Sequence, residues 1–132
     1  MKNKPILIVA GEPKSIFFEI LFKSIKFQNF KSPLIIIASF DLLKKQMKKF
    51  KIKKKIKLLN PNKLKEYKLD NKLINLIDIE LDLKKSENYI KKCFITAFKI
   101  LKTDVTNKFI NGPINKSSFL NKKFLGITEY IS

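Results

Sequence analysis

Histidine, arginine and tryptophan are absent from the sequence, and Cys93 is the only cysteine. Without histidine, the chain alone cannot assemble a cysteine-histidine nucleophile or a zinc cluster. A single cysteine also excludes a disulfide framework. We interpret Cys93 as a small apolar residue at the edge of the core rather than as a reactive thiol. Several reaction classes are therefore excluded.

Long hydrophobic runs are also missing. The main apolar runs, Ile6–Ala10 and Leu34–Ala38, are far shorter than the ~20 residues that a membrane-spanning helix needs. Although Lys2 and Lys4 precede the first run, it is shorter than the roughly 7–15 apolar residues of a signal peptide. We therefore expect a cytoplasmic protein that is not integral to a membrane.

The length and the apolar content predict one folded unit. The chain has 132 residues, so one domain is the upper limit. Hydrophobic residues make up 45% of it and include 12 Phe, which is enough to bury a core and excludes general disorder. We find no repeat and no linker, and expect residues 1–132 to lack an internal domain boundary.

Lysine dominates the charge of the chain. The 29 basic residues are all Lys, and against 11 acidic residues they give a formal net charge of +18. Such a charge suggests nucleic acid as a partner, but specific base readers rely on Arg, which is absent. The densest run, Lys44–Lys57, is interrupted by apolar residues, so its stems can cover apolar surface while the ammonium groups stay in water. We favour a solvated face and consider nucleic acid an unlikely partner.

Continuous apolar runs predict a parallel sheet. Ile6–Ala10 and Pro33–Ser39 are rich in β-branched residues and have the pattern of strands covered on both faces. Further strands are predicted at Lys54–Leu59, Leu73–Ile79 and Phe109–Asn111. Because helical segments alternate with these strands, the predicted fold class is α/β, with a layered, mostly parallel sheet and flanking helices.

The helices are predicted from apolar residues at helical spacing. The segments are Ser15–Gln28, Asp41–Phe50, Ser86–Lys102 and a short helix that begins at Asn115. In Ser86–Lys102 the apolar stripe consists of Ile90, Phe94, Ala97, Phe98 and Leu101.

The first predicted helix has a side without lysine. Ile16, Ile20 and Ile25 fall near one side of it, with Lys23 and Lys26 toward another. Ser15 is in a position to cap its amino end.

Glycine is rare, so its positions carry information. Gly11 and Gly112 each follow a predicted strand and precede a predicted helix, and Gly126 is the third. The carboxyl ends of parallel strands meet at the edge of the sheet where ligands bind. Glycine there allows a sharp turn or a close approach of the backbone.

Each glycine opens a short polar motif. The motifs are GEPKSIFFE at Gly11–Glu19, GPINK at Gly112–Lys116 and GITEY at Gly126–Tyr130. The first is neither a P-loop nor a GxGxxG dinucleotide fingerprint. In the second, Lys116 can reach a phosphate or a carboxylate at the edge of the sheet.

Taken in this order, the motifs resemble those of the 4-hydroxythreonine-4-phosphate dehydrogenase family (PdxA) of vitamin B6 biosynthesis. That family has GDPAGIGPE, GPINK and GHTEYLA at the corresponding places. The resemblance covers the whole chain at low similarity and implies a fold like that of isocitrate and isopropylmalate dehydrogenases. Because family members are more than twice this long, we expect an incomplete, N-terminal fragment.

The resemblance implies an NAD-dependent oxidation of 4-phosphooxy-threonine, a phosphorylated hydroxy amino acid, followed by decarboxylation. It also implies a divalent metal and a site shared between the subunits of a homodimer. For this chain it implies substrate-binding positions at Lys116, Ile127 and Thr128. No catalytic or cofactor-binding residue is assigned, and no metal ligand is expected within the chain.

The chain departs from the family pattern at several positions. Ile127 stands at the family histidine and can neither hydrogen-bond nor titrate. Ser15, Phe17 and Phe18 stand where the family has Gly, Gly and Pro, which changes the backbone path of the first loop. We therefore expect the 132-residue chain alone to be inactive. Two alternatives are a lysine-rich module that binds RNA or another polyanion, and a degenerate, non-catalytic relative.

Overall fold

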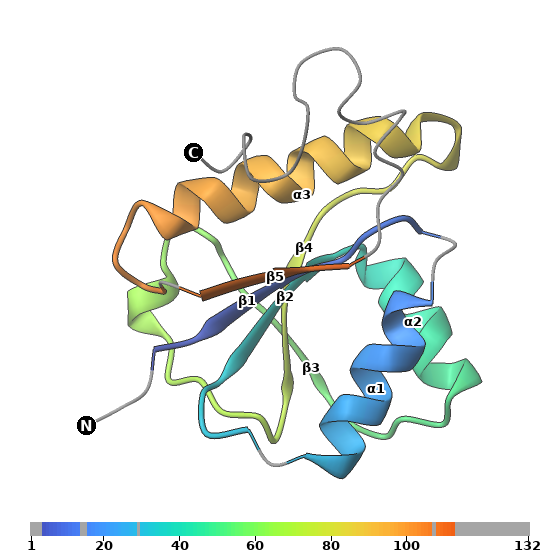
Figure 1. Cartoon of the computed structure of the whole chain (residues 1–132), viewed down its shortest axis with the longest axis horizontal. Helices are drawn as coiled ribbons and strands as arrows, with labels where there is room; N and C mark the ends of the chain where they lie inside the picture. Colours follow the sequence, from blue (N-terminus) through green and yellow to red (C-terminus); the bar gives the residue numbers. More distant parts are fainter. Residues whose placement is uncertain (1–3, 14–15, 29, 107, 113–132) are drawn as a thin grey trace.

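Five parallel strands form one sheet in the part of the chain that the computed structural model describes, residues 4–13, 16–28, 30–106 and 108–112 (Figure 1). The order across the sheet is β3-β4-β2-β1-β5, and every recorded pairing is parallel. The strands are β1 (Ile6–Val9), β2 (Leu34–Ala38), β3 (Ile56–Leu58), β4 (Ile74–Asp78) and β5 (Lys108–Asn111). Both the predicted fold class and the predicted strands are confirmed.

Helices cover both faces of the sheet (Figure 1). The helices are α1 (Phe17–Phe27), α2 (Phe40–Lys49) and α3 (Ser86–Leu101), with short 3-10 turns η1 (Leu64–Glu66) and η2 (Leu83–Lys85). Alternate side chains of each strand enter opposite cores, so Leu7 and Val9 pack beneath α3 whereas Ile8 packs beneath α1 and α2. All five side chains of β2 are buried, as expected for a central strand covered on both faces.

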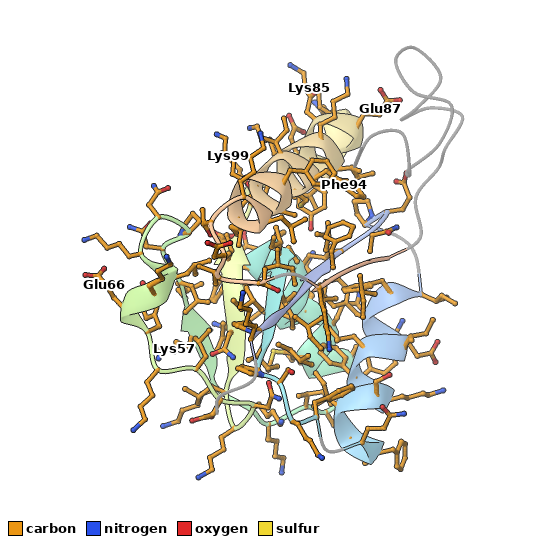
Figure 2. All side chains as sticks on the ribbon, turned by 60° about the vertical axis from the view of Figure 1, so that its left-hand side comes forward. Lys57, Glu66, Lys85, Glu87, Phe94 and Lys99 are labelled. Carbon is orange, nitrogen blue, oxygen red and sulfur yellow. The ribbon has the colours of Figure 1, made fainter. Side chains whose placement is uncertain are left out.

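The helix α3 packs its predicted apolar stripe onto the sheet. Ile90, Phe94 and Ala97 are buried, and the Phe94 ring lies 5.8 Å from the ring of Phe109 on β5. Lys85 and Lys99 project away from the sheet on the outer side of this layer (Figure 2). The predicted orientation of this helix is therefore confirmed.

The three isoleucines that the sequence analysis grouped on one side of α1 do not share a side, because Ile25 is partly buried against the core. The residues packed on the sheet are Phe17, Phe18, Leu21 and Phe22, whereas Ile16 and Ile20 are 60% and 51% exposed. This helix carries apolar residues on nearly every side, so spacing alone does not select one. The phenylalanines bury more area per residue and meet edge-to-face, with the rings of Phe17 and Phe18 5.0 Å apart.

The amino end of α1 also differs from the prediction. The helix begins at Phe17, and its N-cap position is Ile16, whose side chain makes no capping hydrogen bond. Ser15, the predicted cap, lies outside the described residues. Within the described ranges, no helix is long and apolar enough to cross a bilayer.

Candidate functional site

The carboxyl ends of the strands define one edge of the molecule. Because the pairings are parallel, the strands end on the same side, and α1, α2 and α3 begin there (Figure 1). Open α/β sheets bind ligands at this edge. We refer to it as the carboxyl edge and to the other as the amino edge.

Two of the three glycines meet at the carboxyl edge. Gly112 follows β5, and its backbone N–H donates to the carbonyl oxygen of Val9 at 2.7 Å, beside Gly11. A Cβ at Gly112 would lie 2.6 Å from Cδ1 of Phe17 and 2.7 Å from the backbone nitrogen of Gly11. Gly112 is thus required by close packing rather than by a left-handed backbone, since neither described glycine has a positive φ. Gly126 lies outside the described residues.

The start of α2 is closed by hydrogen bonds from its neighbours. The N–H of Ser39 donates to the hydroxyl of Tyr89 at 2.9 Å, and the N–H of Phe40 donates to Oδ1 of Asp78 at 2.8 Å. Oγ of Ser39 accepts from the N–H of Leu42 at 3.3 Å. These three N–H groups already donate hydrogen bonds within the protein, so they are not available to bind a phosphate at this helix end.

Asp78 and Tyr89 are edge residues that the sequence analysis did not single out. Asp78 is the last residue of β4 and directly follows a buried apolar run, and this position in the sequence could have indicated an edge residue. Tyr89 contacts Ser39 across 50 positions of sequence, for which the sequence contains no signal.

Cys93 and Tyr89 form a buried pair beneath this edge. Their side chains are 0% and 1% exposed. Burial raises the pKa of Cys93 to about 12 and the pKa of Tyr89 above its ordinary value. A thiol with such a pKa stays protonated at neutral pH, which supports the interpretation of Cys93 as a core residue.

The residues expected to bind substrate lie outside the described part of the chain. These are Lys116, Ile127 and Thr128, together with Asn115 at the start of the last predicted helix. The carboxyl edge on which GPINK begins is described as far as Gly112. The roles of these residues remain predictions.

The described residues do not fit a divalent metal centre. Among them, no group of three or more His, Cys, Asp or Glu side chains lies close enough together to hold an ion. The whole sequence also lacks histidine. The described residues alone therefore do not provide the ligands of such a centre, and no step through a metal is derived.

The amino edge is closed by two side-chain amides. Oδ1 of Asn71 accepts from the N–H of Leu34 at 2.8 Å, and Nδ2 of Asn71 donates to the carbonyl oxygen of Ser32 at 2.8 Å. Nδ2 of Asn75 donates to the carbonyl oxygens of Leu34 and Asp70 at 3.1 and 3.0 Å. A hollow of about 460 Å³ lies beside these residues, away from the glycines.

Three solved structures that share the fold are named as 4-hydroxythreonine-4-phosphate dehydrogenases, one of them as a candidate. The fold matches a 4-hydroxythreonine-4-phosphate dehydrogenase from Burkholderia phymatum with a TM-score of 0.81 and 15% sequence identity, covering 99% of this chain and 43% of that one. It matches a candidate member of the same class from Salmonella typhimurium with a TM-score of 0.79 and 19% identity, covering 98% of this chain and 44% of that one.

A third structure, the 4-hydroxythreonine-4-phosphate dehydrogenase from Klebsiella pneumoniae, matches with a TM-score of 0.77 and 18% identity. The match covers 96% of this chain and 43% of that one. This chain thus spans less than half the length of the enzymes whose fold it shares. No family model and no curated protein matches the sequence.

Proposed function

We propose that this chain is the N-terminal portion of a cytoplasmic, NAD-dependent 4-hydroxythreonine-4-phosphate dehydrogenase that acts as a homodimer. The observation that carries the proposal is the agreement of two independent signals. The order of the three glycine motifs resembles this family, and the fold of the described residues matches solved dehydrogenases of the same name at TM-scores of 0.77–0.81.

The substrate class is implied by the family resemblance, and the motif residues suit it. Lys116 supplies a cation for the phosphate or the carboxylate of 4-phosphooxy-threonine, and the hydroxyl of Thr128 supplies a hydrogen bond. Ile127 offers an apolar contact where the family has histidine. NAD, when bound to the complete protein, supplies the hydride acceptor.

The packing at Gly112 supports the placement of this motif. Gly112 is held against Gly11 and Phe17 at the carboxyl edge, so the chain that follows starts from a fixed point there. A fixed starting point limits where Lys116 can reach. Residues from the rest of a longer polypeptide complete the site, and the 132-residue chain alone has no dehydrogenase activity.

Kinetics of the longer protein test the proposal. We expect the reading frame that contains this chain to encode a protein that reduces NAD in the presence of 4-phosphooxy-threonine. Thr128→Val should lower kcat/KM about 10- to 100-fold, because it removes one hydrogen bond to the substrate. Thr96→Val, on α3, is the matched control and should leave kcat/KM unchanged. Equal kinetics for the two variants would remove Thr128 from the site.

One observation favours polyanion binding as a second candidate. Lys44, Lys45, Lys48 and Lys49 are exposed along α2, and the one recorded ion pair between described residues joins Lys23 to Glu19 on α1. Binding of the chain to nonspecific RNA that persists at physiological salt would support this function. Binding that weakens steeply as the salt concentration rises would instead reflect only the nonspecific attraction of a net charge of +18.

The third candidate is a degenerate relative that has lost catalytic activity. A growth assay distinguishes it from an active dehydrogenase. A longer protein that restores growth of a dehydrogenase-deficient strain without added pyridoxine is catalytic. Failure of a folded, well-expressed longer protein to restore growth supports the degenerate relative, in which Ile127 has replaced a functional histidine.

A further inference from the structure

The outer face of α1 carries three exposed apolar side chains beside the exposed Lys23. Ile16, Ile20 and Phe27 are 60%, 51% and 75% exposed. Their spacings of four and seven residues place them on one side of the helix, opposite the phenylalanines that contact the sheet. A solvent-facing side of a helix is ordinarily polar, so this face requires an explanation.

The lysine-rich composition does not explain the exposed apolar side chains of α1. The helix α2 lies on the same side of the sheet, and its outer face carries exposed lysines, including Lys45 and Lys48. Where a side chain of this protein faces water, lysine is the common choice. The outer face of α1 carries Lys23 as well, yet three of its exposed side chains are large and apolar.

The strand β5 adds a second uncovered surface next to α1. Within the sheet that the structure describes, β5 pairs with β1 and has no neighbour on its other side. A Cβ at Gly112 would point at Phe17 of α1, and residues two apart in a strand share a face, so Ile110 lies on the α1 side of the sheet. Ile110 is 55% exposed. We call Ile16, Ile20, Phe27 and Ile110 the α1–β5 surface.

The solved neighbours indicate what covers the α1–β5 surface. They match 96–99% of this chain, yet this chain spans 43–44% of their lengths. More than half of each such polypeptide therefore lies outside the part that resembles this chain and is available to cover this surface. A second copy of this chain is a poorer occupant, since each copy carries a formal charge of +18 and the copies repel.

We propose that the α1–β5 surface is the internal interface on which the remaining polypeptide of the longer protein docks, with one of its strands pairing with the free edge of β5. This proposal rests on the proposed function only in requiring a longer protein. An unpaired strand edge accepts a strand through its free backbone groups, and the exposed isoleucines supply the apolar contact.

The test compares lysine variants in two lengths of the protein. Ile16→Lys combined with Ile20→Lys replaces two exposed apolar side chains of the α1–β5 surface. Ile95→Lys on α3, where Ile95 is 45% exposed, is the matched control. In the 132-residue chain, both variants should keep the far-ultraviolet circular dichroism of the parent, because these side chains face water. This comparison shows that neither variant prevents folding.

In the longer protein, the two variants should differ. We expect the double variant to speed amide hydrogen exchange in α1 and β5 by at least 10-fold, and Ile95→Lys to leave it within 2-fold. Equal exchange in the double variant and the control would overturn the proposal, as would a reading frame that stops directly after Ser132. Because exchange is read without substrate, an inactive protein can still confirm the interface, and an active one can still refute it.

Discussion

The two edges of the sheet are built in different ways. At the carboxyl edge, Gly112 and Gly11 bring backbone against backbone, with the ring of Phe17 beside them. At the amino edge, the side-chain amides of Asn71 and Asn75 tie loops to strand ends. Both edges are therefore closed by packed groups, and the hollow of about 460 Å³ lies at the amino edge. The proposed function puts the ligand at the carboxyl edge, where Gly11 and Gly112 meet, and leaves the amino edge a structural role.

At neutral pH, the largest effect should follow from adding a side chain at Gly112. Gly112→Ala places a methyl group 2.7 Å from the backbone nitrogen of Gly11, which cannot move aside cheaply. We expect a loss of about 3 kcal/mol in the free energy of unfolding, measured by urea titration. Asn111→Ala, one residue earlier on β5, should cost about 1 kcal/mol. Equal losses would show that the close approach is not what fixes this edge.

A smaller effect is expected at the amino edge. Asn75→Ala removes a donor from two carbonyl oxygens, that of Leu34 in a buried hydrogen bond and that of Asp70 in a part-buried one. It also removes Oδ1 of Asn75, a buried acceptor for which no partner is recorded among the described residues. The net loss should be about 2 kcal/mol in the free energy of unfolding.

The exposed Asn62 provides the control for this prediction. Asn62→Ala should change the free energy of unfolding by less than about 0.5 kcal/mol. If Asn75→Ala were equally mild, the amino edge would not depend on its amides, and the contrast with the carboxyl edge would fail.

The buried thiol beneath the carboxyl edge predicts a pH dependence. In the folded state the pKa of Cys93 is raised from 9.0 to about 12 by burial. Above pH 9 the unfolded chain releases this proton while the folded chain keeps it, so stability falls as pH rises from about 9 to 12. Below pH 9 the buried thiol of Cys93 contributes its full stabilisation. Above pH 9 the free energy of unfolding falls by about 1.4 kcal/mol per pH unit because of this group.

Unfolding titrations at several alkaline pH values measure this slope. Because lysines also titrate in that range, the comparison is with Cys93→Ala. The variant should have a shallower decline between pH 9 and 12 than the parent chain. Parallel declines would mean that Cys93 ionises as readily in the folded protein as in the unfolded one.

The smallest effect should come from the hydroxyl of Tyr89. Tyr89→Phe keeps the ring in the core and leaves the buried N–H of Ser39 without its acceptor, which should cost about 1 kcal/mol. Tyr67→Phe is the control, because the hydroxyl of Tyr67 accepts from the N–H of Asn60 at an exposed position. A thermal melt that shifts equally for both variants would contradict a special role for Tyr89 at the carboxyl edge.

Most of the fold was predictable because its signals are local. The strands β1 and β2 are continuous β-branched runs, and α3 has a single apolar stripe, so one arrangement buries each of them. The helix α1 was predicted correctly as a helix, but the grouping of its isoleucines on one side was wrong, because apolar residues lie on most of its sides. Its orientation depends on which side chains fill the space over the sheet, and spacing does not encode that.

The candidate site was predictable only in part. Glycines after strands indicated the carboxyl edge, and Gly11 and Gly112 do meet there. Gly112 is needed because it packs against Phe17, which lies almost a hundred residues earlier in the chain. No pattern in the sequence indicates this contact. The bond from Ser39 to Tyr89 is of the same kind. Long-range contacts of this sort follow from the packed fold.

Substrate mapping on the longer protein tests the central claim most directly. When 4-phosphooxy-threonine is titrated into isotopically labelled protein, the amide resonances of Gly11 and Gly112 should shift. Those of Asn71 and Asn75, at the amino edge, should stay in place. Shifts confined to the amino edge, or no shift at either edge at millimolar substrate, would contradict the account.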